Sequence, residues 1–154
     1  MRTMTETNQP IMSEHDEIRA LIHRYCDAVC TNNEEQWINT WTNDGVWNIG
    51  RGDVVGREAI LAAYQKAMGL FERIFQLTHN GTASIDGNTA TGQWYVTEHG
   101  RSLKGTPVLY IFHYDDEYRK TEDGWRFARR AITWHYLGKP DMTGTFGPPP
   151  GSVA

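Results

Sequence analysis

The sequence has little cysteine, no long apolar run and no excess of positive charge. Its two cysteines, Cys26 and Cys30, are four residues apart in one predicted helix, where the geometry for a disulfide between them is poor. We therefore expect a reduced, cytoplasmic protein. No apolar stretch approaches the roughly 20 residues that a membrane-spanning helix needs. The polar N-terminus also lacks the apolar segment of a signal peptide.

The charge of the chain argues against nucleic acid as a partner. The formal net charge is -4, and the basic cluster of Arg126, Arg129 and Arg130 is short and interrupted, whereas phosphate binding requires clustered cations. The glycine-rich stretch GDVVG lacks the strand–loop–helix setting of a phosphate loop. No serine has a base placed beside it by any motif. These absences favour chemistry without a cofactor.

Aromatic residues, in contrast, are abundant: the 154 residues include 6 Trp, 7 Tyr and 5 Phe. A core needs far fewer tryptophans, so some of these rings are expected to line a cavity for an apolar or flat ligand. A bulky core with interface anchors explains them equally well. The length fits one domain with a sizeable core.

The apolar periodicity divides the chain into helices and then strands. Ser13 and Asp16 predict a helix start, and the 3–4 spacing of apolar residues carries this helix to about residue 31. Shorter elements follow it: helices at 34–41 and 57–68, a strand at 46–49 and a hairpin-like excursion at 50–56. After Gly69 the period changes to 2, which predicts strands at 75–85, 89–98, 108–118 and 125–136.

This order predicts an α+β fold, with three N-terminal helices packed on one face of a strongly curved antiparallel sheet. One domain is predicted at 13–140, between a flexible tail at 1–12 and a Pro/Gly-rich tail at 141–154.

The first helix shows which of its side chains face the core. At about 100° per residue, Tyr25 falls within the apolar stripe, Cys26 and Cys30 lie at its border, and Asp27 lies opposite as a surface acid. His23 shares one helix edge with the two cysteines. No CxxC or HxxxH pattern supplies the remaining ligands of a closed site, so we expect no metal.

Five segments carry a resemblance to a known family: IRALIHRYCDAV, WINTWTNDGVW, GREAI, THNGTASIDGNTATGQWYVTE and DGWRFARRAITWHYLG. Together they resemble the SnoaL-like branch of the NTF2-like superfamily, whose fold is a cone-shaped α+β barrel. Within that branch the chain is most similar to the lyase group of scytalone dehydratase, bile-acid 7α-dehydratase and hexachlorocyclohexane dehydrochlorinase. The resemblance implies a cofactor-independent lyase or isomerase that acts on a hydrophobic, ring-containing molecule, as in polyketide or steroid metabolism.

The resemblance also implies roles for particular residues. His79 matches the family histidine that removes a proton from carbon, and Tyr25 matches an assisting tyrosine. Imidazole suits a general base because its pKa lies near working pH. The family aspartate that orients this histidine falls on Cys30, and a thiol performs that task poorly.

The strands are expected to supply the cavity walls. Alternation places Trp94, Val96 and Glu98 on one face of their strand, and the resemblance turns that face inward. An inward Glu98 would have a raised pKa and could transfer protons; the alternative is a strand-end acid in water. His135 either protonates a leaving hydroxyl or caps a carbonyl. The resemblance assigns these further residues to the lining: Cys30, Trp41, Trp47, Tyr110, Phe112, Tyr114 and Thr133, with Trp134 outside.

Three functions remain open. The first is the lyase or isomerase, with His79 as base, Tyr25 as hydrogen-bond donor, and Glu98 and His135 as proton carriers. The second is a non-catalytic binding or assembly domain without the family's acid. The third is a covalent enzyme with Cys30 as nucleophile, although the helix C-terminus disfavours a thiolate there. Exposed strands predict a homodimer or homotrimer through the outer face of the sheet.

Overall fold

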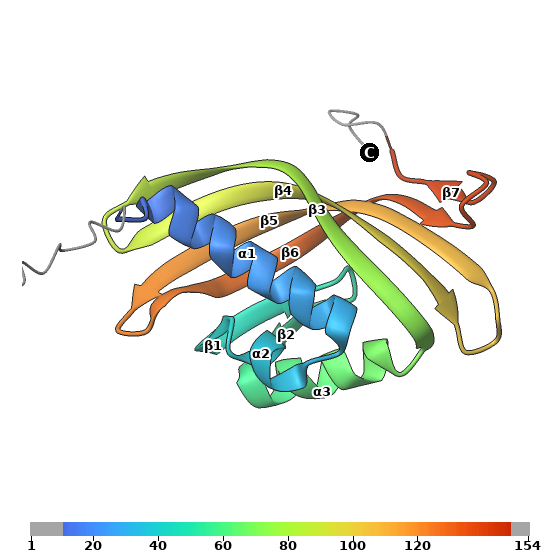
Figure 1. Ribbon diagram of the computed structural model, residues 1–154, viewed down its shortest axis with the longest axis horizontal. Coiled ribbons are helices and arrows are strands. Elements are labelled where there is room, and N and C mark those ends of the chain that lie inside the picture. Colours follow the sequence, from blue (N-terminus) through green and yellow to red (C-terminus); the bar gives the residue numbers. More distant parts are fainter. Residues whose placement is uncertain (1–10, 149–154) are drawn as a thin grey trace, which may run out of the picture.

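The computed structural model describes residues 11–148 as helices followed by a curved sheet (Figure 1). The helices are α1 (Glu14–Thr31), α2 (Glu34–Ile38) and α3 (Arg57–Met68). The strands are β1 (Trp41–Asn48), β2 (Asp53–Val55), β3 (Phe71–Asp86), β4 (Thr89–Ser102), β5 (Pro107–Thr121), β6 (Gly124–Gly138) and β7 (Thr145–Phe146). The predicted α+β class is confirmed.

The sheet has the order β2-β1-β6-β5-β4-β3, and β7 pairs with β6. All pairs are antiparallel except β1 with β6, which is parallel. Figure 1 shows α1 lying across the long strands, with α2 and α3 beside β1 and β2. We call the face of the long strands toward α1 the inner face and the opposite face the outer face.

Helix α1 begins after Ser13 and buries its apolar stripe, as its sequence predicts. The Ser13 side chain accepts a hydrogen bond from the Asp16 backbone N–H, and the Asp16 carboxylate accepts from Ser13 in return. This reciprocal cap satisfies donors that a helix start leaves free. Tyr25 is buried against the sheet and Asp27 is exposed, so the orientation derived from the apolar stripe is confirmed.

Some predicted boundaries were wrong. The turn expected at 99–101 is part of β4, and the chain turns instead at 103–106. Strand β1 starts at Trp41, where a helix was expected to end. Thr145 and Phe146, assigned to a tail, pair with Leu137 and Tyr136 of β6. The parts of the predicted tails at 1–10 and 149–154 lie outside the described residues.

The pairings of β3 with β4 and of β5 with β6 contain two register shifts each, and one in each pairing decides which candidate site residues face inward. In β3, Thr78 pairs with Val96 but Gly81 pairs with Trp94, so β3 has one extra residue between these pairs. In β6, an extra residue at Ala128 separates the pairs of Phe127 and Arg129 with β5. A bulge shifts the alternation of all residues beyond it, which strand periodicity alone does not reveal.

No helix among residues 11–148 is long and apolar enough to cross a membrane.

Candidate functional site

His79 does not face the interior, which conflicts with its place as the base of an inner cavity that the resemblance implied. On β3 the inner positions before the bulge are Ile74, Gln76 and Thr78, so His79 points to the outer face. It is exposed, and its Nε2 lies 2.8 Å from the hydroxyl of Thr97. It therefore has no carboxylate partner in the interior. The preceding residue, Thr78, faces inward instead.

The predicted facing of the last strand was also wrong. Because of the bulge at Ala128, Trp134 pairs with Phe112 on the inner face, and both Thr133 and His135 lie outside. His135 stacks on Tyr95 of β4.

On the outer face, His135 belongs to a chain of polar contacts. Its Nε2 lies 2.8 Å from Nδ1 of His113, and Nε2 of His113 lies 3.2 Å from the Asp115 carboxylate. Burial, and then the nearby His113, lower the pKa of His135.

Most of the predicted cavity walls are packed core. Six residues expected to line the cavity are each at most 5 % exposed: Trp41, Trp47, Trp94, Val96, Phe112 and Tyr114. The rings of Trp41 and Trp47 pack against each other and against Trp37, and Phe112 packs edge-on against Tyr114. Trp37 in turn stacks on Tyr64, with ring centroids 4.2 Å apart. Trp37 was not among the predicted residues.

Tyr25 faces inward as predicted, but its hydroxyl is already engaged. Only 1 % of Tyr25 is exposed, and its hydroxyl lies 3.3 Å from that of Tyr114. Burial, and then the proximity of the Tyr114 phenol, raise its pKa. Tyr25 thus belongs to the deep core, away from the half-buried positions that a ligand reaches first.

The half-buried end of the inner face holds a row of polar side chains. Glu98 of β4 is the direct cross-strand neighbour of Gln76 on β3 and of Tyr110 on β5. Nε2 of Gln76 donates to the Glu98 carboxylate at 2.7 Å. Phe71 and Trp134 pack edge-on against the Tyr110 ring. Glu98 faces inward, as the resemblance implied for its face of the strand, and it has an aromatic rim of Phe71, Tyr110 and Trp134.

The electrostatics single out Glu98. Burial raises the pKa of Glu98 to about 7, although the hydrogen bond from Gln76 lowers it in part. Burial, and then the charge of Glu98, raise the pKa of Tyr110. A carboxyl group with a pKa near neutrality both accepts and releases protons at working pH.

The two cysteines of α1 contact Gln76 and its neighbour Thr78 on β3. Sγ of Cys26 lies 3.2 Å from the side-chain oxygen of Gln76 and 2.8 Å from the hydroxyl of Thr78. The half-buried Cys30 contacts the backbone N–H and C=O of Gln76, at 3.2 and 3.4 Å. Both thiols are free.

A buried ion pair on the inner face was missed by the sequence analysis. Arg130 makes two hydrogen bonds to the Asp116 carboxylate, at 2.8 and 3.0 Å, and neither side chain is more than 1 % exposed. Tyr118 also donates to Asp116, at 2.7 Å. The Arg130 guanidinium lies over the rings of Tyr25, Tyr114 and Phe127. The inward position of Asp116 could have been predicted from the sequence, because Asp116 continues the alternation of the inward residues Tyr110, Phe112 and Tyr114.

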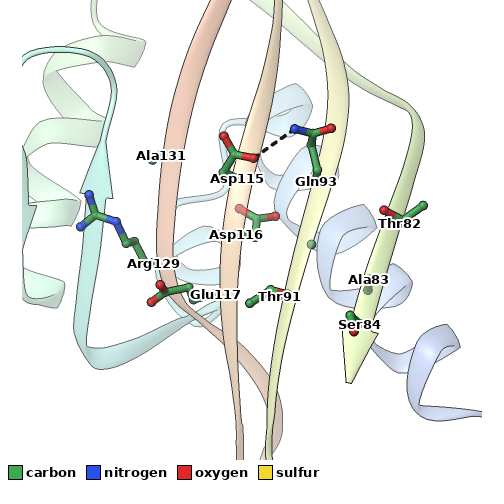
Figure 2. Close-up of a pocket in the computed structure, with 11 residues that line it drawn as sticks. Thr82, Ala83, Ser84, Thr91, Gln93, Asp115, Asp116, Glu117, Arg129 and Ala131 are labelled. Carbon is green, nitrogen blue, oxygen red and sulfur yellow. Dashed lines mark hydrogen bonds between the residues drawn. The ribbon is translucent and has the colours of Figure 1, made fainter. Parts of the chain in front are cut away.

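A groove of about 640 Å³ lies on the outer face (Figure 2). Figure 2 shows its walls on β3, β4, β5 and β6, with the Gln93 amide donating to Asp115 across it. Its lining is mainly polar and includes Thr82, Ser84, Thr91, Glu117 and Arg129. Among the predicted site residues, none lines this groove.

In the part of the chain that the structure describes, no group of three or more His, Cys, Asp or Glu side chains is arranged to hold a metal ion.

The SnoaL-like domain family matches residues 11–131. Among solved structures, LinA superposes with a TM-score of 0.76 at 22% identity, over 88% of this chain and 93% of LinA. A proposed aromatic ring hydroxylase from Novosphingobium aromaticivorans has a TM-score of 0.77 at 25% identity, over 86% and 98% of the two chains. A proposed scytalone dehydratase from the same organism has a TM-score of 0.77 at 17% identity, over 90% and 94%. No curated protein sequence matches the chain.

Proposed function

Because the chain belongs to the family of SnoaL-like domains, we propose that it is a cofactor-independent lyase or isomerase in which Glu98 transfers the proton. The observation that carries this proposal is an inward carboxyl group with a pKa of about 7, set beside an aromatic rim. The substrate class that fits is a hydrophobic, ring-containing molecule with an acidic C–H bond. Relatives with this fold include hexachlorocyclohexane dehydrochlorinase LinA type 2 and the proposed scytalone dehydratase.

Glu98 takes the role that the sequence analysis gave to His79. The two side chains lie on opposite faces of the sheet, since Glu98 bonds Gln76 inside and His79 bonds Thr97 outside. Asp116, the other carboxylate of the inner face, is held by Arg130 and Tyr118. Glu98 is thus the inner carboxylate that is only half-buried, and we assign it the contact with a ligand at the rim.

The proposed step is a proton transfer with a compensating shift of electrons. Glu98 takes a proton from a carbon of the ring, and the C–H electron pair becomes a C=C bond. In an elimination, the leaving group on the next carbon departs with its bonding pair. In an isomerisation, the new C=C bond joins the carbon of an adjacent carbonyl, whose π pair moves onto its oxygen to give a conjugated enolate. The oxygen pair then re-forms the C=O bond, and the protonated Glu98 returns the proton to a different carbon of the conjugated system. We assign to the Tyr110 hydroxyl, on the neighbouring strand, a hydrogen bond to the oxygen that gains charge.

The test uses cyclic β-hydroxyketones, scytalone and hexachlorocyclohexane as probes, with NMR in D₂O to follow deuterium incorporation and product formation. Glu98→Gln keeps the size of the side chain but cannot accept the proton, so turnover should fall by at least about a hundredfold. Wild-type kcat/KM should rise with pH through about 7, as Glu98 becomes the carboxylate.

His79→Ala is the matched control, and it should leave turnover unchanged because His79 lies on the other face. Retention of wild-type turnover by Glu98→Gln would remove Glu98 from the mechanism. If none of the probes exchanges a proton and Glu98 titrates like an exposed glutamate, the chain is better described as a binding domain.

A further inference from the structure

We propose that Gln76 is the positioning residue for Glu98, and that the Cys26 thiol fixes the orientation in which the Gln76 amide serves it. This inference rests on the proposed role of Glu98. It assigns functions to two inner residues that face neither the rim nor solvent.

Gln76 is held in one place by contacts from two elements. It is 3 % exposed, and its backbone N–H and C=O contact the thiol of Cys30 on α1. Its side chain then reaches its cross-strand neighbour Glu98, with a donor–acceptor distance of 2.7 Å. The short distance is typical of a hydrogen bond to an ionised acceptor.

The amide of Gln76 has two different ends, and only one suits an ionised Glu98. A carboxylate can only accept hydrogen bonds, so the NH₂ end must face it. The C=O end then faces Cys26, whose Sγ lies 3.2 Å away. Burial raises the pKa of Cys26 to about 11, so this thiol is protonated at neutral pH. It therefore donates a hydrogen bond to the amide oxygen.

Thr78 extends this chain of hydrogen-bond donors beyond Cys26. The Thr78 hydroxyl lies 2.8 Å from Sγ of Cys26 and can donate to the sulfur while the thiol donates to Gln76. Donors therefore run from Thr78 through Cys26 and Gln76 to Glu98. Hydrogen bonds aligned in this way strengthen one another, and they favour the charged form of Glu98.

The other titratable groups that face Glu98 do not supply a positive charge. They are the thiol of Cys26 and the phenols of Tyr110 and Tyr114, which are neutral at neutral pH. The Gln76 amide is accordingly the group that opposes the effect of burial on Glu98. Without it, Glu98 would remain protonated at neutral pH and could not act as a base.

The experiment is an NMR titration of the Glu98 side-chain carboxyl carbon, assigned with Glu98→Gln. Gln76→Leu keeps a similar volume but removes the donor, and the pKa of Glu98 should rise by about one unit or more, as expected for the loss of a hydrogen bond to a charged group. Where turnover is measurable, the pH profile of kcat/KM should shift in the same direction.

The cysteines provide a matched set that tests the orientation of the amide. Cys26→Ala removes the donor to the amide oxygen and should raise the pKa of Glu98 by a smaller amount than Gln76→Leu. Cys26→Ser keeps a hydroxyl donor and should restore the wild-type value. Cys30→Ser changes a contact to the Gln76 backbone alone and should leave the pKa of Glu98 in place, whatever it does to stability.

An unchanged pKa of Glu98 in Gln76→Leu and in Cys26→Ala would overturn the inference. If Gln76→Leu does not fold, the comparison of Cys26→Ala with Cys26→Ser decides it. A shifted pKa in a protein that turns over no probe would sustain the positioning role and reject the catalytic one, so the two proposals fail separately.

Discussion

At the scale of single residues, the contrast between Asp116 and Glu98 shows how neighbours decide the use of a buried acid. Both lie on the inner face, but Asp116 receives two hydrogen bonds from Arg130 and one from Tyr118. Glu98 receives one, from the neutral Gln76 amide. The first acid is committed to an ion pair that no solvent reaches, and the second is left able to exchange a proton.

The buried ion pair should be costly to break. Asp116→Ala leaves the Arg130 guanidinium buried without a counter-charge, so we expect the free energy of unfolding to fall by about 3–5 kcal/mol. Urea denaturation at pH 7 measures this loss. Glu72→Ala, which breaks the exposed pair with Arg101, is the control and should cost no more than about 1 kcal/mol. Similar losses from both variants would show that Arg130 finds another partner.

At the scale of elements, the sequence predicted the facing of α1 and β4 but not that of β3 and β6. Helix α1 and strand β4 are regular across the site, so counting from Ile18 gives the buried side of the helix. Counting from Trp94 groups the residues of one strand face, which the resemblance turned inward. Strands β3 and β6 each have two register shifts. In β6, the shift at Ala128 reverses the facing of Thr133, and His135 is itself the extra residue between the pairs of Trp134 and Tyr136 with β5. The position of His79 was transferred from a family match that is one residue out of step with the inner face. No pattern in a single sequence reports such an offset.

The bulge in β3 brings its backbone close to β4. A Cβ atom on Gly81 would lie 2.3 Å from Cε3 of Trp94 and 2.5 Å from the carbonyl oxygen of Gln93. Backbone and a buried ring would both have to move, so Gly81→Ala should lower the free energy of unfolding by about 1–3 kcal/mol. Thermal denaturation compares it with Thr82→Ala at the exposed neighbouring position, which should stay within about 0.5 kcal/mol of wild type. A neutral Gly81→Ala would mean that the two strands separate easily there.

At the scale of the whole molecule, the two faces of one sheet carry different chemistry. The inner face has an apolar core with the Gln76–Glu98–Tyr110 row at its half-buried end. The outer face has an exposed groove and the contacts from Asp115 through His113 to His135. The α+β architecture followed from periodicity, and the aromatic core was one of the two interpretations that the composition left open. The division of polar residues between the faces did not, because it depends on strand register.

The same division gives the stability of the molecule two opposing pH dependences. Glu98 has a pKa of about 7 when folded, above its ordinary value of 4.5, so the folded state binds more protons between these values. This contribution is complete below the unfolded pKa and is lost as pH rises through about 7. His135 has a lowered pKa when folded, so its contribution is present at high pH and is lost as pH falls below the unfolded value of about 6.5.

A comparison of Glu98→Gln with wild type separates the two effects, because His135 is the same in both proteins. The glutamine is neutral at every pH, so the variant should gain stability relative to wild type by about 2–3 kcal/mol between pH 5 and pH 8. Urea denaturation of both proteins at the two pH values measures this difference. An equal difference at pH 5 and pH 8 would mean that Glu98 titrates as an exposed glutamate does, and that the inner face holds no group able to exchange a proton near neutrality. His79→Ala, on the outer face, should not reproduce the effect.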